Sequence, residues 1–183
     1  MNKSTLIPFL RENLEILFVG LNPATGSSSK GHYFSVNQAL WNQLFDSGLI
    51  TQRIDKSEAD LTVFGSASIN RSNWSYGITD LLPEIAESDS RIIKPSDADC
   101  ERLKNDIVKY EPEAVILLHG KVLSSFLGYL DADIPESNSG KMGKLIKGCD
   151  SMFFNIAFPH GNAISSDLKI ARYREVVEYL EKG

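Results

Sequence analysis

The chain has 183 residues, 42% hydrophobic and 23% charged, which is the composition of an ordinary globular protein that can bury a core as a single domain over residues 1–183. Its formal net charge of −5, from 19 Lys+Arg against 24 Asp+Glu, counts against broad electrostatic binding to nucleic acid, although it permits a local basic face. The two cysteines, Cys100 and Cys149, are too few for an iron–sulfur cluster or a closed zinc site, and we expect ordinary buried thiols.

The N-terminal segment precedes the first predicted strand and contains no long apolar region. It reaches Arg11 and Glu12 before any apolar run of signal-peptide length, so we expect no secretory signal and a cytoplasmic protein. No apolar run approaches the length that crosses a membrane, so we also expect no membrane partner.

Four short apolar runs predict buried β-strands. Their apolar character is nearly continuous rather than alternating, which is typical of parallel strands covered on both faces. In chain order they are EILFVG (15–20), YGITDLL (76–82), AVILLHG (114–120) and MFFNIAF (152–158).

Helical patterns lie between and after these strands. Residues 37–48 place apolar side chains on one face and end at Gly48, a residue type that favours helix ends. Residues 96–110 open with Ser96 and Asp99 at the spacing of a capping box. Two more helices are predicted over 121–130 and 165–182, the last with Leu168, Ala171, Val176 and Leu180 toward the core.

The alternation of strands and helices predicts an α/β sandwich around a mainly parallel sheet. Residues 50–75 show no clear pattern and are expected to contain helix and loop. In open α/β sheets the ligand lies where the carboxyl ends of the strands meet the loops. We therefore expect the loops after Gly20 and Phe158 to share one rim with the strand ends at Leu82 and His119.

The loop after the first strand, FVGLNPATGSSSKGHYFS (18–35), does not match the common catalytic glycine motifs. It lacks the spacing and lysine of a Walker A loop, the third glycine of a dinucleotide fingerprint, and the pattern of a nucleophile elbow. The three histidines of the chain have no ligand spacing, so we expect no metal site.

Two interpretations of this loop stay open from the residues alone. Asn22, placed beside Pro23 just past a strand, could orient a water through its carbonyl oxygen, while Tyr33 and Phe34 stack on a flat ligand. Alternatively, Asn22 and Pro23 form only a turn, and the two aromatic side chains belong to the core.

A longer stretch, FVGLNPATGSSSKGHYFSVNQALWNQLFDSGLIT (18–51), resembles the first motif of the uracil-DNA glycosylase superfamily, most of all its branch of bacterial mismatch uracil and thymine-DNA glycosylases. The likeness continues in order through YGITDLL, YEPEAVILLHGKV and FFNIAFPHGN, and so covers nearly the whole chain. It implies a three-layer α/β/α sandwich with a central four-stranded, mainly parallel sheet. It also implies hydrolysis of the N-glycosidic bond of a flipped-out aberrant base, without metal or cofactor.

The resemblance also implies roles for individual residues. Asn22 would orient the water that attacks C1′ of the sugar, and backbone N–H groups between Leu21 and Ala24 would stabilise the departing base as an anion. Phe34 would stack on that base. Lys121 could contact a DNA phosphate or be merely solvated. The other implied contacts are Gly20, Leu21, Pro23, Tyr33, Pro159 and Gly161 for the substrate, and Lys30, Asn162 and Ile164 for DNA.

The chain departs from the family pattern in its first and second loops. Ala24 stands where the mismatch branch usually has glycine, and Phe158 stands where relatives have Asn, Met or His before the proline. His160 could replace that polar contact, bind phosphate or be structural. Relatives place an apolar wedge near the position of Asn162, where the nearest apolar residue here is Ile164.

A further departure is Asp80, in the place where relatives have Asn or Lys near the base. An ionised aspartate only accepts hydrogen bonds, which suits a base with N–H donors, whereas a buried, protonated one could be a general acid toward the leaving base. Either role hints at a base other than plain uracil, such as a deaminated purine. Alternatively, Asp80 only caps the turn before Pro83.

The leading hypothesis is a cofactor-free, monomeric and monofunctional DNA glycosylase of base-excision repair, with Asn22, Asp80 and His160 as its catalytic residues and DNA containing an aberrant base as its partner. The alternative is a non-catalytic nucleic-acid-binding paralogue of the same fold. A basic groove beside an open pocket would favour the enzyme. The residues expected to line that groove are Lys30, His32, Arg71 and His160.

Overall fold

The structure is a computed structural model that describes residues 2–183 of the chain. Within these residues, a five-stranded sheet with four parallel strands and one antiparallel edge strand forms the centre. In sheet order the strands are β3 (Tyr76–Asp80), β2 (Ile16–Gly20), β5 (Ala114–Leu117), β7 (Met152–Asn155) and β6 (Gly140–Gly143).

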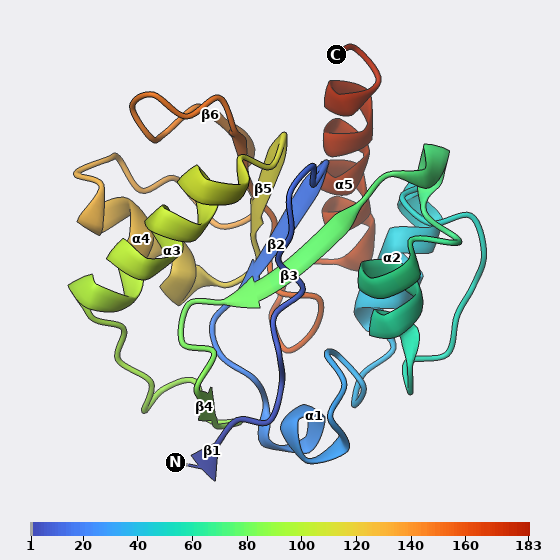
Figure 1. The fold of residues 1–183 in the computed structure, drawn as a ribbon, viewed down its shortest axis with the longest axis horizontal. Helices are drawn as coiled ribbons and strands as arrows, with labels where there is room; N and C mark the ends of the chain where they lie inside the picture. Colours follow the sequence, from blue (N-terminus) through green and yellow to red (C-terminus); the bar gives the residue numbers. More distant parts are fainter. Residues whose placement is uncertain (1) are drawn as a thin grey trace.

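Helices cover both faces of the sheet, as Figure 1 shows. On one side lie α2 (Ala39–Ser47) and α5 (Ser166–Leu180), and on the other lie α3 (Asp97–Tyr110) and α4 (Gly120–Tyr129). The predicted three-layer α/β/α sandwich is therefore confirmed. The smaller elements are β1 (Asn2–Lys3), α1 (Thr25–Lys30), a π-helical turn η1 (Leu61–Ser66), a 3-10 turn η2 (Arg71–Asn73) and β4 (Ile85–Ala86).

Side chains alternate along the central strands and divide the core into two layers. On β2, Ile16 and Phe18 pack in the layer of α2 and α5, whereas Leu17 and Val19 pack in the layer of α3 and α4. Every residue of β2 is buried, because helices cover both faces of a parallel sheet. The continuous apolar runs in the sequence follow from this double burial.

Local sequence signals set the helix ends where they were expected. Ser96 and Asp99 form the predicted capping box: the Ser96 N–H donates to the Asp99 carboxylate at 2.8 Å, and the Asp99 N–H donates to Ser96 Oγ at 3.4 Å. Gly48 follows α2 with a φ of +83°, a left-handed conformation that glycine adopts readily.

The structure also corrects the prediction at the edges of the fold. β6 adds a fifth strand, antiparallel to β7, to the four predicted ones. On α5, Leu168 is 58% exposed and Ala171 is also exposed, because the buried face follows Ile170 and Tyr173 instead. The unassigned residues 50–75 contain the short turns η1 and η2.

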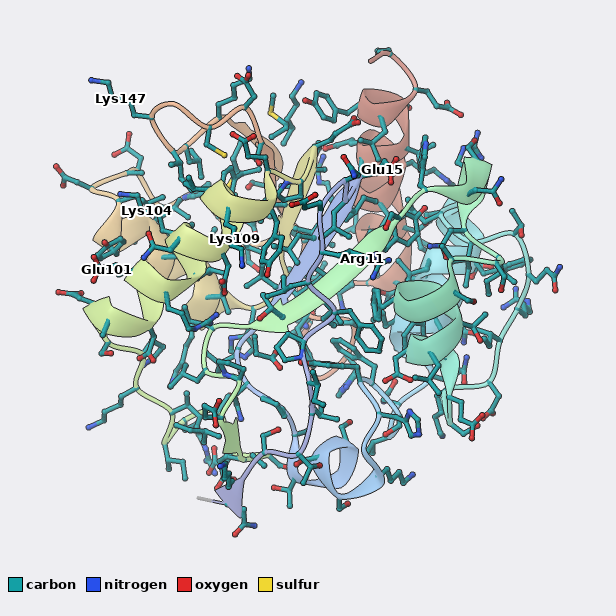
Figure 2. The ribbon with its side chains drawn as sticks, in the orientation of Figure 1. Arg11, Glu15, Glu101, Lys104, Lys109 and Lys147 are labelled. Carbon is teal, nitrogen blue, oxygen red and sulfur yellow. The ribbon has the colours of Figure 1, made fainter. Side chains whose placement is uncertain are left out.

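The four parallel strands bring their carboxyl ends to one edge of the sheet. In Figure 1, α1, β1 and β4 lie together below the ends of β2 and β3. The charged side chains of Lys104, Lys109 and Lys147, labelled in Figure 2, lie well away from these three elements. No helix among residues 2–183 is long and apolar enough to cross a membrane.

Candidate functional site

A cavity of about 560 Å³ opens at the carboxyl edge of the parallel strands. This volume lies in the range of sites that bind small molecules. The wall comes from the loop after β2, the residues after α1, the end of β3, the loop after β4, the start of α4 and the loop after β7. As predicted, the loops that follow Gly20 and Phe158 meet at one site.

The side-chain amide of Asn22 is fixed by backbone carbonyls. Its Nδ2 donates to the oxygens of Glu87 at 2.8 Å, Pro23 at 3.0 Å and Ile85 at 3.3 Å. Because only the nitrogen of an amide can donate, these acceptors determine which way the side chain faces. The side-chain hydrogen bonds of Asn22 among residues 2–183 all use Nδ2, so Oδ1 of this cavity-lining residue is free to accept one.

The backbone of the same loop presents donors. Among the described residues, the N–H groups of Asn22 and Ala24 donate to no acceptor, and Pro23 between them has no N–H. The carbonyls of Leu21 and Pro23 are occupied, because they accept from Leu82 and Glu87 at 2.8 and 3.0 Å. The loop is thus held by its carbonyls while two amide donors stay available at the rim of the cavity.

Phe34 lines the cavity in an unusual backbone conformation. Its φ is +50°, in the left-handed region that residues other than glycine seldom adopt, and the Trp41 indole N–H donates to its carbonyl at 3.1 Å. The ring packs edge-on against Trp41, with centroids 6.3 Å apart, and is tilted against Phe158 at 5.9 Å. Packing and a hydrogen bond therefore hold a strained residue that lines the cavity.

The neighbouring Tyr33 is buried at 3% exposure and its hydroxyl has no partner among the described residues. Its backbone N–H donates to Asp60 Oδ2 at 2.8 Å, and His32 Nδ1 lies 3.0 Å from Asp60 Oδ1. Asp60 thus holds the chain on the approach to Phe34. Burial and the nearby carboxyl groups raise the pKa of Tyr33, so its hydroxyl stays protonated.

The loop after β7 is anchored from beneath. The carbonyl of Pro159 accepts from Gln43 Nε2 at 3.0 Å and from Lys169 Nζ at 3.2 Å, and both donor side chains are buried. Above this anchor, Asn162 Nδ2 donates to the carbonyls of Phe158 and His160, which closes the turn. The loop is therefore preorganised on two helices, α2 and α5.

His160 lies on the exposed side of this loop, its ring 5.0 Å from that of Phe158. Desolvation and the nearby Lys169 lower its pKa, so the imidazole is neutral near pH 7. A neutral imidazole can donate one hydrogen bond and accept another, but it carries no charge with which to attract phosphate.

Asp80 ends β3 and is 4% exposed at the cavity wall. It pairs in register with Gly20 on β2, and a Cβ at position 20 would overlap its Oδ1. Glycine at this position therefore makes room for the carboxyl group. Burial raises the pKa of Asp80 to about 7, although Arg102 acts in the opposite direction.

Most of the residues predicted from the sequence meet at this cavity. Those that line it are Gly20, Leu21, Asn22, Pro23, Tyr33, Phe34, Asp80, His160, Gly161 and Asn162. The cavity lining does not include Pro159, Lys30, Lys121 or Ile164. Pro159 acts through its anchored carbonyl, and Lys30 is exposed with its Nζ 3.4 Å from the carbonyl of Ser35.

Two of the four residues named for a basic groove, Arg71 and His32, lie outside the cavity wall, whereas His160 lines it. Arg71 pairs with Glu181 at the end of the chain and also donates to the carbonyl of Gly48. His32 is engaged with Asp60. Neither belongs to the cavity wall, because each side chain is turned to a partner from another element.

The structure shows contacts of Lys121 within the protein. Its Nζ donates to three backbone carbonyls of the loop before α3, those of Ser90, Arg91 (3.2 Å) and Ile93 (2.8 Å). An ammonium group has three donors, so a phosphate could be contacted only by giving up one of these bonds. Lys121 therefore holds a loop that borders the cavity.

Replacing Lys121 with alanine should leave the salt dependence of DNA affinity unchanged, because its charge is committed to the protein backbone. The measurement is fluorescence anisotropy of a labelled duplex at several salt concentrations. Each lost phosphate contact lowers the log–log slope by about 0.9. Lys30→Ala, which removes an exposed lysine, is the matched comparison. A drop of about 0.9 for Lys121→Ala would restore its role as a phosphate contact.

Sequence reasoning gave no role to some wall residues, notably Glu87 and His119, although it placed His119 on the rim. His119 caps α4, where its Nδ1 accepts the N–H of Lys121 at 3.0 Å, and its ring lies 5.8 Å from that of Phe158. Its position after the third predicted strand was a usable signal, because that strand end belongs to the rim. Desolvation lowers its pKa, so it is neutral near pH 7.

No cluster of three or more His, Cys, Asp or Glu side chains within residues 2–183 could hold a metal ion. Comparison with models of known protein families gives one match. The family model described as "Uracil DNA glycosylase superfamily" matches residues 7–181 of the 183. No curated protein matches the chain significantly.

Proposed function

The chain belongs to the uracil-DNA glycosylase superfamily, and from this premise we propose that it is a monofunctional DNA glycosylase of base-excision repair. Members of the superfamily are typically DNA glycosylases. The proposed substrate is a flipped-out aberrant base, uracil or another deaminated or mismatched base, in DNA. The proposed enzyme works as a monomer and without a cofactor.

The observation that carries the proposal is the orientation of Asn22. Three backbone carbonyls accept from its Nδ2, so its Oδ1 is left as an acceptor at the cavity wall. A water that donates to Oδ1 would be held in place to attack C1′ of the deoxyribose. The new bond joins the water oxygen to C1′, and a water proton passes to solvent.

The bond that breaks joins C1′ to the ring nitrogen of the base, and its electron pair leaves with the base. Negative charge therefore grows on the base while the sugar gains oxocarbenium character. The unpaired backbone N–H groups of Asn22 and Ala24 are the donors that we propose for this charge. They require no proton transfer at the moment of bond cleavage.

Aromatic side chains supply the platform for the extruded base. Phe34 lines the cavity beside Phe158, and every base has a flat face that can stack on such a surface. The strained backbone of Phe34 supports this role, because strain of this kind is often kept at functional positions.

Single-turnover excision on short labelled duplexes tests the proposal. The duplexes carry uracil, hypoxanthine, xanthine or a thymine mismatch, each against different opposing bases, and a single-stranded uracil oligomer is included. We expect alkali-labile abasic sites to form with at least one of these substrates, and no strand break without alkali. Strand breaks without alkali would indicate a lyase and contradict the monofunctional mechanism.

The alternative function is a non-catalytic nucleic-acid-binding paralogue of the same fold, which the altered loop at Phe158 and the net charge of −5 permit. Binding to damaged duplexes with no base released from any substrate would support this alternative. If the protein neither binds damaged duplexes nor releases a base, both proposed functions are contradicted.

A further inference from the structure

The carboxyl group of Asp80 is a buried polar group without a partner. Its side chain is 4% exposed at the cavity wall, and Oδ2 contacts no donor among residues 2–183. The missing Cβ of Gly20 provides the space that Oδ1 occupies. A buried carboxyl oxygen without a donor is costly, so its retention at a cavity points to a ligand group that completes it.

Among residues 2–183, no cation forms a salt bridge with this carboxyl group. The nearest guanidinium, that of Arg102, donates instead to the backbone carbonyls of Asp80 at 2.7 Å and Leu81 at 3.1 Å, and it pairs with the carboxylate of Asp106. Arg102 thus fixes the end of β3 without making a salt bridge to the Asp80 side chain. The Tyr33 hydroxyl at the same cavity is likewise unpaired.

A neutral carboxylic acid has one O–H donor and one carbonyl acceptor, side by side, whereas a carboxylate has acceptors only. The lactam edge of uracil, hypoxanthine and xanthine presents the complement: a carbonyl oxygen next to a ring N–H. An ionised Asp80 would place its negative oxygen against that carbonyl oxygen. Only the neutral form can therefore make both hydrogen bonds to such a base.

Given the glycosylase function proposed above, on which this inference rests, we propose that Asp80 reads the lactam edge of the flipped base as a neutral carboxylic acid. Its O–H donates to the base carbonyl, and its C=O accepts from the adjacent ring N–H. The chemical class of the ligand is a lactam-bearing base, pyrimidine or purine. Asp80 then acts as a specificity residue whose protonation sets the pH range of the enzyme.

The direction of the pH dependence follows from the groups around the cavity. Burial keeps Asp80 neutral up to a pKa of about 7, so recognition weakens as the pH rises above it. Tyr33, whose pKa is raised, stays protonated in this range, and His119 and His160, whose pKa values are lowered, are already neutral. The other charged groups near Asp80 are the guanidinium of Arg102, which donates to its backbone carbonyl, and the carboxyl group of Glu87 in the wall.

The test measures single-turnover excision of uracil and hypoxanthine from duplex DNA between pH 6 and 9, for the wild-type protein and for Asp80→Asn. We expect the wild-type rate to fall about tenfold per pH unit above about 7. Asparagine has the same shape and a permanent donor and acceptor, so Asp80→Asn should have a flat profile from pH 7 to 9. Circular dichroism confirms that the variant is folded.

Binding to a duplex with a 2′-fluoroarabino hypoxanthine nucleotide, which resists hydrolysis, keeps this inference separable from the proposed function. If no base is released by the wild type, the glycosylase function fails. The inference still stands if binding weakens with pH in the wild type but not in Asp80→Asn. Parallel pH profiles for the two proteins, or wild-type recognition that strengthens with pH, would overturn it.

Discussion

Replacing Asn22 with alanine should lower the single-turnover rate of base excision by a factor on the order of 10²–10⁴, with little change in affinity for damaged DNA. The variant loses Oδ1, the acceptor proposed to orient the attacking water. It also leaves the carbonyls of Pro23, Ile85 and Glu87 without their shared donor. Quenched-flow or manual single-turnover assays with saturating protein measure the rate, and anisotropy measures the affinity.

Asn42→Ala is the matched control for this substitution, because it makes the same chemical change on the exposed face of α2, outside the cavity wall. It should excise at the wild-type rate. A thermal melt separates a chemical effect of Asn22→Ala from unfolding. If Asn22→Ala is folded and excises within about threefold of the wild type, a water oriented by Asn22 cannot be the mechanism.

Replacing Phe34 with alanine should reduce excision by about 5- to 150-fold, the equivalent of about 1–3 kcal/mol of base–aromatic stacking. Without the Phe34 ring, the extruded base should be held less tightly. Binding to the 2′-fluoroarabino duplex should therefore weaken in parallel with excision. Phe34→Tyr keeps the flat ring and should stay close to the wild type. Excision and binding are measured on the same duplexes as for Asn22.

The control for this second substitution is Phe45→Ala, on α2, where the ring is half-buried outside the cavity wall and lies under the guanidinium of Arg53. It should lower the free energy of unfolding while the excision rate per folded molecule stays unchanged. Equal losses of excision for Phe34→Ala and Phe45→Ala would assign Phe34 to the core instead. That outcome would support the interpretation in which the aromatic pair is structural.

Much of the fold follows from local patterns in the sequence. β2, β3, β5 and β7 were identifiable because burial on both faces leaves continuous apolar runs. β6, with the sequence GKMG, was not, since an edge strand that pairs on one side requires no such run. The buried face of α5 was also misplaced, because its position depends on how the helix is rotated against the sheet.

The candidate site was predictable where backbone topology alone decides the position. Asn22 and Asp80 come together because parallel strands end at one edge, and the chain after α1 brings Phe34 to the same cavity. The partners of long charged side chains were not predictable. Lys121 holds a loop, and Arg71 pairs with Glu181, the residue that follows α5. Such partners are set by tertiary contacts between residues far apart in the sequence.

The most direct test of the central claim is to measure the free base itself. Wild-type protein in excess is incubated with duplexes that contain uracil or hypoxanthine at pH 6.5, and the released base is quantified by liquid chromatography and mass spectrometry. We predict one equivalent of free base per duplex and an intact strand with an abasic site. Duplex that is bound by the protein but keeps its base would contradict the account.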